Sequence, residues 1–493
     1  MKCGVFRKLT LGASCAVLLA AMAQGAATQV MRTNPQALDP VPVGTVDSVT
    51  QPHVPGGRGR NVVPEAGERQ TKWSTMTLQQ AVGIGVLTNP ERGVVANNRR
   101  ATDEELRQAK GLYLPSIDSR LDGGYEYTRN PITEAGSSSG AEDLWRYNAG
   151  ITLTQMLFDG FAAKYENLRQ QARVLSASHR VQEAAELDGL AAVEDYLEVM
   201  RQRELLTIAR DNVNAHNTIL DQITDSTKSG KTTQADLQQA RARIAAARAE
   251  EENVRDALRT GEADFIRDIG QQPEDLIMPA TPNAALESNV EEEVKVSLSQ
   301  SPTIHIADAD LVVAHQEYEA TQSSFYPKFD LQLQGQDGEN VNALEGQSKN
   351  ASALVVMNWN LYRGGIDIAK RREYINREAQ AKEQRAKTAR GIEEDVRKTW
   401  AGMVSSGERT QEFTSQAAAN VEVVKAYKDQ FDLNRRTLLD VLDSQNELFV
   451  ARANAVNAQY LEMFAVYRML ALKGDLLKTL EVPVPRESDH AKM

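Results

Sequence analysis

Cysteine is nearly missing from this chain of 493 residues. Its two cysteines, Cys3 and Cys15, both lie in an N-terminal segment that we predict to be removed. The remaining chain can then form no disulfide, thiolate metal site or cysteine nucleophile. Aromatic residues make up only 5% of the chain, against 41% hydrophobic and 25% charged residues. This balance favours long helices over thick globular cores.

Long apolar runs are also scarce. The one clear case, from Leu9 to Ala23, follows basic residues and ends in small residues, which predicts a secretory signal peptide over 1–23. No later stretch of about 18 apolar residues exists, so we expect no transmembrane helix, and any part that crosses a membrane must consist of strands. The net charge of -12 argues against nucleic acid as a partner.

Motifs of enzyme chemistry are absent from the sequence. There is no Gly-rich phosphate loop, nucleophile elbow or metal-binding motif, and the six histidines are scattered. His305 and His315 are too far apart in sequence for the i, i+4 spacing of a helical ligand pair. We therefore predict that the protein is not an enzyme and has no catalytic or metal-binding residues and no cofactor. We expect the helical histidines to face solvent.

An internal duplication is the strongest positive signal in the sequence. Asn89-Pro90 recurs 212 positions later as Ser301-Pro302. Leu157-Phe158-Asp159-Gly160 recurs 204 positions later as Leu361-Tyr362-Arg363-Gly364, and the markers beyond this point keep the offset of 204. A constant offset over ordered markers indicates two copies of one unit.

These markers divide the chain into five parts. After the signal peptide, residues 24–75 are rich in Pro and Gly and are predicted to be a flexible leader. The first repeat spans 76–286 and the second spans 287–477. A flexible C-terminal tail is expected over 478–493.

Each copy contains two segments with the period of a strand. Apolar and polar residues alternate over 117–125, over 329–333 and over the returning segment 355–361. The segments 130–143 and 337–349 are rich in Gly, Ser and Asn and are predicted to be exposed loops. A half-buried sheet of a soluble protein is the alternative. Aromatic residues near the strand ends and charges on the polar face favour a membrane sheet that faces water on one side.

Unusually long helices follow each strand pair, because long stretches of the chain contain no proline. In the first copy we predict helices over about 162–228 and 233–268, and in the second over about 366–431 and 437–473. A helix of about 67 residues is a rod on the order of 100 Å long. The predicted fold is mainly α-helical, with a strand hairpin and a long helical coiled-coil hairpin in each repeat.

The segment Gln430–Gln445, with the sequence QFDLNRRTLLDVLDSQ, resembles the last helical turn and the return helix of the TolC family. The segments that end in Gly160 and Gly364 resemble its strand-to-helix elbows. The resemblance covers residues 76–477. It implies a TolC-like α/β-barrel, in which a homotrimer completes a 12-stranded outer-membrane barrel and the helices form a long periplasmic extension.

The resemblance also implies a periplasmic gate. The aspartates of the family's selectivity ring match Asp440 and Asp443, which lie three residues apart and so share a helix face. Such a ring favours cations. The gate arginine matches Arg436, and its carboxylate partner on the first turn matches Asp236. An ordinary solvated helix end with intrahelical ion pairs is the alternative for these residues.

Two gate positions depart from the family pattern. The aromatic gate position, usually Tyr, is Phe431 here, which removes a hydroxyl. The usual turn glycine is Asn434, whereas the first copy keeps Gly230 at the matching position. Asn tolerates the left-handed conformation that Gly supplies, so the turn itself is expected to form.

The run from Arg436 to Leu448 is most similar to family members that serve type I protein secretion. The predicted function is the exit duct across periplasm and outer membrane for such a system. The implied partners are a periplasmic membrane-fusion adaptor, an inner-membrane ABC transporter, the exported protein and outer-membrane lipid. The alternative is the outer-membrane component of a proton-driven pump that exports drugs. A soluble periplasmic coiled-coil adaptor is a further alternative.

Overall fold

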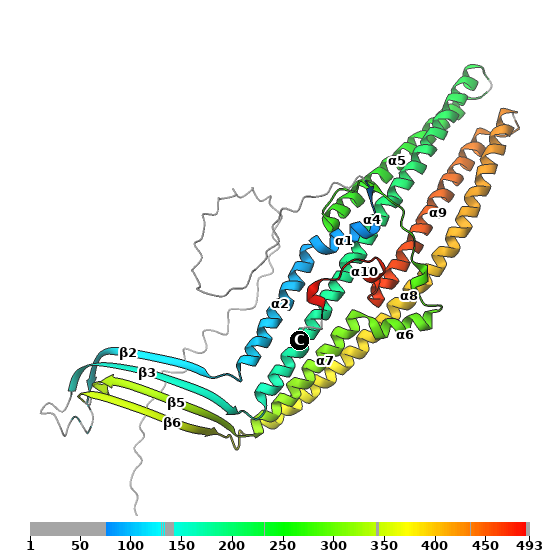
Figure 1. Ribbon diagram of the computed structural model, residues 1–493. Helices are drawn as coiled ribbons and strands as arrows, with labels where there is room; N and C mark the ends of the chain where they lie inside the picture. The colour runs from blue at the N-terminus through cyan, green and yellow to red at the C-terminus, as the bar shows by residue number, and fades with distance from the viewer. Residues whose placement is uncertain are drawn as a thin grey trace, which may run out of the picture. The chain divides into compact units, whose positions relative to one another are not determined.

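The computed structural model describes residues 75–129, 131, 133, 142–230, 232–341, 345–433 and 435–489. The predicted signal peptide, the predicted leader up to residue 74, and Asn434 lie outside these residues. Between residues 75 and 489 the sheet lies at one end of the helices, and the two turns between long helices lie at the other (Figure 1).

Four strands form one antiparallel sheet in the order β2-β3-β5-β6. They are β2 (Ser116–Thr128), β3 (Glu142–Phe158), β5 (Lys328–Glu339) and β6 (Gln347–Asn358). In this register Tyr125 lies opposite Trp145, and Leu153 lies opposite Leu333. The strands predicted from alternation are confirmed, but β6 ends at Asn358, before the predicted 361, and β5 and β6 extend into the predicted loop 337–349. Because β2 and β6 are the outer strands, both edges of the sheet are unpaired within the described chain.

The helices repeat in length as well as in order. The long helices α4 (Ala162–Lys228) and α8 (Ile366–Asp432) have 67 residues each, and the return helices α5 (Gln234–Ile269) and α9 (Leu438–Lys473) have 36 each. The four predicted helices are therefore confirmed to within two residues at each end. The boundaries of the two repeats, 76–286 and 287–477, stay a prediction.

Shorter elements complete the described chain. A two-residue parallel bridge joins β1 to β4, and short helices precede the first strand of each hairpin. These elements are β1 (Thr75–Met76), α1 (Leu78–Thr88), α2 (Pro90–Gly111), β4 (Asp275–Leu276), η1 (Asn283–Ala285), α6 (Val290–Gln300), α7 (Pro302–Ala320), η2 (Thr321–Phe325), α10 (Leu476–Thr479) and η4 (Arg486–Ser488).

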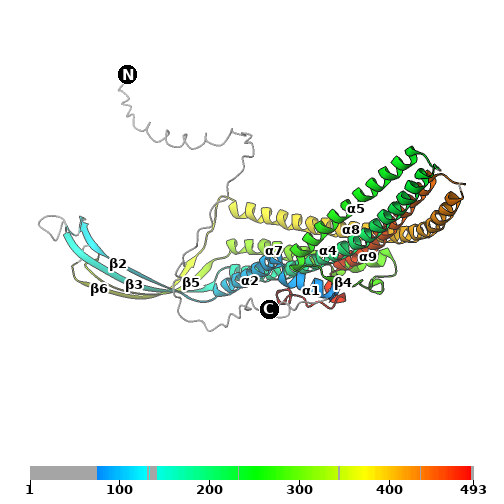
Figure 2. The same cartoon turned by 90° about the horizontal axis from the view of Figure 1, so that it is seen from above.

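The order of the helices next to the sheet follows the order of the strands. There α2 packs on α4, α4 on α7 and α7 on α8, an order that Figure 1 shows, and Figure 2 shows α7 beside α8 from above. Toward the turns, α4 packs on α5 and α9, and α9 packs on α8. The helices α7 and α9 thus share the space between α4 and α8, each covering part of its length.

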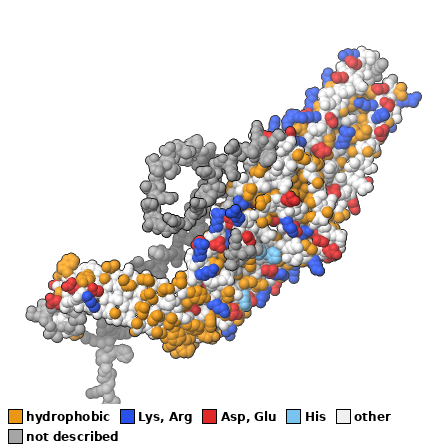
Figure 3. All heavy atoms as spheres, viewed as in Figure 1, with side chains coloured by type: hydrophobic (Ala, Val, Ile, Leu, Met, Phe, Trp, Pro, Cys, Tyr) orange, Lys and Arg blue, Asp and Glu red, His pale blue; other side chains and the backbone are white. Residues whose placement is uncertain are grey.

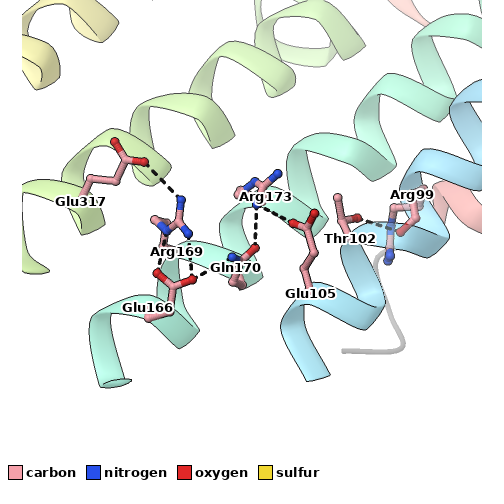
Figure 4. Close-up of polar contacts among 8 residues, drawn as sticks. All are labelled: Arg99, Thr102, Glu105, Glu166, Arg169, Gln170, Arg173 and Glu317. Carbon is pink, nitrogen blue, oxygen red and sulfur yellow. Dashed lines mark hydrogen bonds and ion pairs between the residues drawn. The ribbon is translucent and has the colours of Figure 1, made fainter. Parts of the chain in front are cut away.

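Ion pairs join the helices near the sheet (Figure 4). Arg173 of α4 binds Glu105 of α2 at 2.5 Å, and Arg169 of α4 binds Glu317 of α7 at 3.3 Å. Arg169 also holds Glu166 one turn away at 2.8 Å. These pairs are partly exposed, so each stabilises the packing by no more than about 1 kcal/mol.

The largest hydrophobic cluster, which we call the waist core, lies where α1, α4, α5, α9 and α10 meet. The Tyr196 hydroxyl of α4 accepts a hydrogen bond from Ile277 N (2.8 Å) and donates to Met76 O (2.8 Å), so it ties both strands of the two-residue bridge to α4. The fully buried members of the waist core include Ala81, Val82, Val86, Val193, Tyr196, Phe265, Ile269, Tyr467, Leu470, Leu476 and Leu477.

The segment predicted to be a flexible tail, 478–493, is described as far as Asp489, and there it packs on the first repeat. Val482 is buried in the waist core. Glu487 forms an ion pair with Arg100 of α2 at 2.5 Å. Just before this segment, Leu477 packs so closely on α4 that a Cβ at Gly189 would lie 2.8 Å from its Cδ2.

Candidate functional site: the elbows, the helix turns and the sheet

Each strand-to-helix elbow contains two consecutive residues with positive φ. Gly160 (74°) and Phe161 (70°) precede α4, and Gly364 (63°) and Gly365 (83°) precede α8. Only glycine adopts this conformation without steric cost, which explains a glycine at the first position of both elbows. The predicted elbow residues Gly160 and Gly364 are thus at equivalent places in the fold.

The first elbow is packed and the second is open. A Cβ on Gly160 would lie 2.8 Å from Ser323 O, whereas a Cβ on Gly364 would have no atom within 4 Å. Phe158, Phe161 and Tyr326 surround the first elbow in edge-to-face contacts, with ring centroids 5.2–6.4 Å apart. An aromatic cluster therefore fixes the angle between β3 and α4.

The far ends of the helical hairpins share a second hydrophobic cluster, the tip core. It joins α4 and α5 to α9, so the two hairpins hold each other at their ends. Phe431, the predicted aromatic gate residue, is partly buried and packs against this cluster. The tip core consists of Ile219, Ile223, Leu237, Ala240, Leu438, Val441 and Leu442.

Asp236 and Asp440 occupy the same structural position in the two repeats. Each is the third residue of its return helix and forms a capping box with the preceding threonine, Thr233 or Thr437. The Thr437 hydroxyl donates to Asp440 at 2.8 Å. Hydrogen bonds from this hydroxyl and from the Thr437 N–H hold the pKa of Asp440 below its usual value, with a further contribution from Arg436. Asp440 therefore carries its negative charge at neutral pH.

Asp443 is paired across the hairpins. Arg243 of α5 donates to it at 2.7 Å, with both side chains about half exposed. Arg243 could not be found from the sequence, because residues 200 positions apart give no local signal of contact. Its place in the first half of the return helix, two turns beyond the capping box, is the one hint in the sequence.

Arg436, the predicted gate arginine, binds within its own hairpin. Its Nε donates to Gln430 at 3.0 Å, and its guanidinium lies 4.2 Å from the ring centroid of Tyr427. It lies 3.8 Å from Asp440. Within the described chain it makes no contact with Asp236, so their predicted pairing would have to join two copies of the chain.

Of the two predicted turn residues, Gly230 and Asn434, the structure describes only Gly230. Gly230 has φ of 73° and no atom within 4 Å of a Cβ, so it is required for its conformation and not for close packing. Asn434 lies outside the described residues. The arrangement brings Asp440, Asp443, Arg436 and Phe431 together at one hairpin end, while Asp236 caps the neighbouring one.

The two faces of the sheet differ sharply in polarity. One face exposes apolar and aromatic side chains, with Leu121 80% and Trp145 74% exposed. Figure 3 shows this apolar surface over the sheet and its junction with the helices. On the other face Arg146 of β3 pairs with Asp122 and Glu126 of β2. An apolar face with aromatic residues near its ends suits lipid, and a charged face suits water.

The helical histidines differ in burial. His179 and His216 are buried, so the expectation that the helical histidines face solvent was wrong for these two. His179 of α4 stacks on His305 of α7, with ring centroids 5.0 Å apart, which a single sequence cannot foresee. The described residues contain no group of three or more His, Cys, Asp or Glu that could hold a metal ion. None of the described helices has an apolar stretch long enough to cross a membrane.

A duplicated unit of strand hairpin and long helical hairpin, with one lipid-suited sheet face, defines a class of outer-membrane channel subunits. Residues 88–271 and 294–472 match the model of the outer membrane efflux protein family, and the chain belongs to this family. The resemblance to TolC inferred from the sequence is confirmed. The protein is therefore an outer-membrane efflux channel with a long periplasmic helical part, and its family is one of channels and not of enzymes.

Individual relatives are distant but cover most of the chain. The outer membrane efflux protein BepC of Brucella suis biovar 1 (strain 1330) is 23% identical over 399 residues, covering 80% of this chain and 85% of BepC. TolC of Salmonella enteritidis is 23% identical over 399 residues, covering 78% and 79%. A solved membrane protein from Pseudomonas aeruginosa has a TM-score of 0.73 at 16% identity, covering 82% of this chain and 92% of that chain, which shows a shared fold.

Proposed function

We propose that three copies of this chain form one channel that serves as an exit duct across the periplasm and the outer membrane. The observation that carries the proposal is the four-stranded sheet with a lipid-suited face and two unpaired edges, β2 and β6. Unpaired edges cannot face lipid, because their N–H and C=O groups would lose hydrogen bonds. Pairing of β6 with β2 of the next copy would satisfy both edges. The number three comes from the family.

Fractionation tests this arrangement. The protein should be found in the outer-membrane fraction and run on a gel as an oligomer that becomes a monomer only after heating. A soluble periplasmic species would contradict the proposal and support the adaptor alternative.

A channel of this kind can belong to different export pathways. We propose that this one belongs to a type I protein secretion system. The support is the similarity of the run from Arg436 to Leu448 to members that serve this pathway. In that case an adaptor in the periplasm and an ABC transporter in the inner membrane would deliver a protein to the duct. Drug efflux driven by a proton pump is the second candidate, supported by the relative BepC, which is named an efflux protein.

Deletion of the gene in its host separates the two services. Loss of a secreted protein, with unchanged drug sensitivity, is expected for type I secretion. Increased sensitivity to several drugs, with an unchanged set of secreted proteins, would contradict that service and support efflux. Expression of the intact gene in the deletion strain should restore either phenotype.

We also propose that the hairpin ends close the duct, with Arg436 in a central role. Its contacts with Gln430 and Tyr427 hold the turn of the second hairpin together. Arg436→Ser should loosen this end, raise the conductance in planar bilayers and make cells sensitive to large antibiotics. Arg435→Ser at the neighbouring exposed position is the matched control. Wild-type conductance and sensitivity in Arg436→Ser would exclude the gate role.

A further inference from the structure

A cavity lies beside the place where α7 and α9 meet end to end. After α9 the chain turns away at Gly474, and α7 begins at Pro302. A Cβ on Gly474 would lie 2.7 Å from Pro302 Cδ, so the two helix ends are in contact. Two abutting helix ends cover their neighbours less completely than one continuous helix would. The resulting cavity of about 460 Å³ is lined by α4, α7, α8 and α9 and opens to solvent, and its size is typical of small-molecule sites.

Negative charge dominates the polar lining of this cavity. Glu183 and Glu194 of α4 and Asp395 of α8 line it, against one cation, Arg468 of α9. Glu194 is exposed, and Asp395 is partly exposed and interacts electrostatically with Lys398 one turn away. The Thr303 hydroxyl donates to Glu183 at 2.6 Å. Three carboxylates and one guanidinium give a net charge of about -2.

Glu186 also borders the cavity, but it adds no charge at neutral pH. Burial raises its pKa to about 8, so the side chain is protonated. Its Oε2 accepts hydrogen bonds from the N–H groups of Leu476 (3.1 Å) and Leu477 (3.4 Å). This residue therefore serves the packing of the C-terminal segment.

The remaining wall of the cavity is apolar. Leu187 is 57% exposed although it lies on a long packed helix. Phe464 presents an aromatic ring between the waist core and the cavity. An aromatic face attracts cations as well as apolar groups. Leu190, Ile392, Ala471 and Leu472 also line this wall, and Ser301 adds one polar residue.

The cavity continues along α4 in both directions. A neighbouring cavity of about 210 Å³ shares Glu194 and Phe464 with it. Another, of about 300 Å³, shares Glu183 and Thr303. Glu194 and Glu183 thus lie at the two places where this cavity meets a neighbouring cavity. Both are within reach of an elongated ligand.

We propose that this cavity binds organic cations, compounds with an ammonium or delocalised positive charge on an aromatic or aliphatic body. The apolar wall takes the body, and Glu194 and Asp395 neutralise the charge. Anions are disfavoured by the net negative lining. The site goes beyond the duct function proposed above and depends neither on the cargo nor on the number of chains in the channel.

Fluorescence anisotropy of ethidium, an aromatic cation, tests the site on the full chain purified in an uncharged detergent. Saturable binding is expected, and the double variant Glu194→Gln/Asp395→Asn should weaken it about tenfold, as the loss of two charge contacts would. Leu187→Ser, which changes an exposed apolar residue and no core contact, should weaken it about fivefold. An anionic aromatic dye, anilinonaphthalene sulfonate, should not compete.

A matched control removes the same charge elsewhere. Asp221→Asn/Glu408→Gln changes two exposed carboxylates on α4 and α8 that are not part of the cavity. Unchanged ethidium affinity is expected in this variant. An equal loss in the control, wild-type affinity in Glu194→Gln/Asp395→Asn, or displacement of ethidium by the anionic dye would each overturn the proposal. Failure of the export experiments above would leave these results unaffected.

Discussion

Arg243 and Asp443 form an ion pair of 2.7 Å between the two helical hairpins, at the end where the proposed selectivity ring lies. One of the two ring carboxylates is thereby compensated within each chain. The other, Asp440, is held by Thr437 and keeps its charge. At the scale of residues, we expect Arg243 to tune the predicted ring, and the resemblance to the family did not point to this cation.

Ion selectivity should respond in opposite directions to changes on the two sides of this pair. Asp440→Asn/Asp443→Asn should reduce the preference for cations, because the ring loses its carboxylates. Arg243→Ser should increase it, because Asp443 is left uncompensated. The reversal potential in planar bilayers under a potassium chloride gradient measures both.

Arg248→Ser is the control for this series, since Arg248 lies on the same helix and contacts only Asn217 among the described residues. Its reversal potential should match that of the wild type. An unchanged reversal potential in both the double variant and Arg243→Ser would rule out the ring.

Glu186 makes stability depend on pH. Its pKa is raised from 4.5 to about 8 by burial, so the folded chain binds a proton that the unfolded chain releases between these values. The contribution of Glu186 to the free energy of unfolding is therefore fully present below pH 4.5 and is lost as pH rises to about 8. The shift corresponds to a change on the order of 5 kcal/mol. Burial acts in the same direction on Asp188 and Asp195, whose pKa values rise to about 6 and about 7.

Glu186→Gln should remove most of the loss of stability above pH 7, because Gln accepts the same backbone hydrogen bonds without ionising. Its thermal unfolding midpoint, followed by circular dichroism, should exceed that of the wild type at pH 8.5 and match it at pH 4. A wild-type pH profile in this variant would show that Glu186 does not titrate on unfolding.

At the scale of elements, the two elbows have the same backbone and different surroundings. Gly160 is enclosed by Ser323 and Tyr326, while Gly364 is open. Their matching positions were predicted from the repeated motif, because positive φ and glycine leave a local mark on the sequence. The difference in packing was not predictable, since η2, which closes on Gly160, lies more than 160 positions away in the chain.

Alanine at the two elbows should therefore have unequal effects. Gly364→Ala should cost about 1 kcal/mol, the strain of a left-handed alanine. Gly160→Ala should cost about 3 kcal/mol, because its Cβ also meets the Ser323 carbonyl. Thermal unfolding of the purified proteins measures the difference. Equal midpoints for the two variants would contradict a packing role of the first elbow.

At the scale of the whole molecule, the chain end joins the two repeats. Leu476 and Leu477 follow the last helix of the second repeat and are fully buried against α4 of the first. The ion pair between Lys473 and Glu293, at 3.6 Å with both side chains buried, ties the same helix end to α6 at the start of the second repeat. These contacts hold the two halves in register around the waist core.

Truncation should reveal this role. A chain that ends at Gly474 lacks Leu476, Leu477 and Val482 and leaves Glu186 without its hydrogen-bond donors, so little protein should reach the outer-membrane fraction. A chain that ends at Asp489 keeps these contacts and should accumulate at the wild-type level. Immunoblots of the fractions compare the two. Equal accumulation would show that the C-terminal segment is dispensable.

The sequence by itself determined the lengths and order of the helices and strands, the duplication and the family. Periodicity, glycine at the elbows and turns, and long stretches without proline are local properties of the chain. Only the tertiary structure decided which distant residues meet. The Arg243–Asp443 pair, the buried histidines His179 and His216, the packed C-terminal segment and the cavity at the junction of α7 and α9 all depend on contacts between residues far apart in sequence, and such contacts leave no period in a single chain.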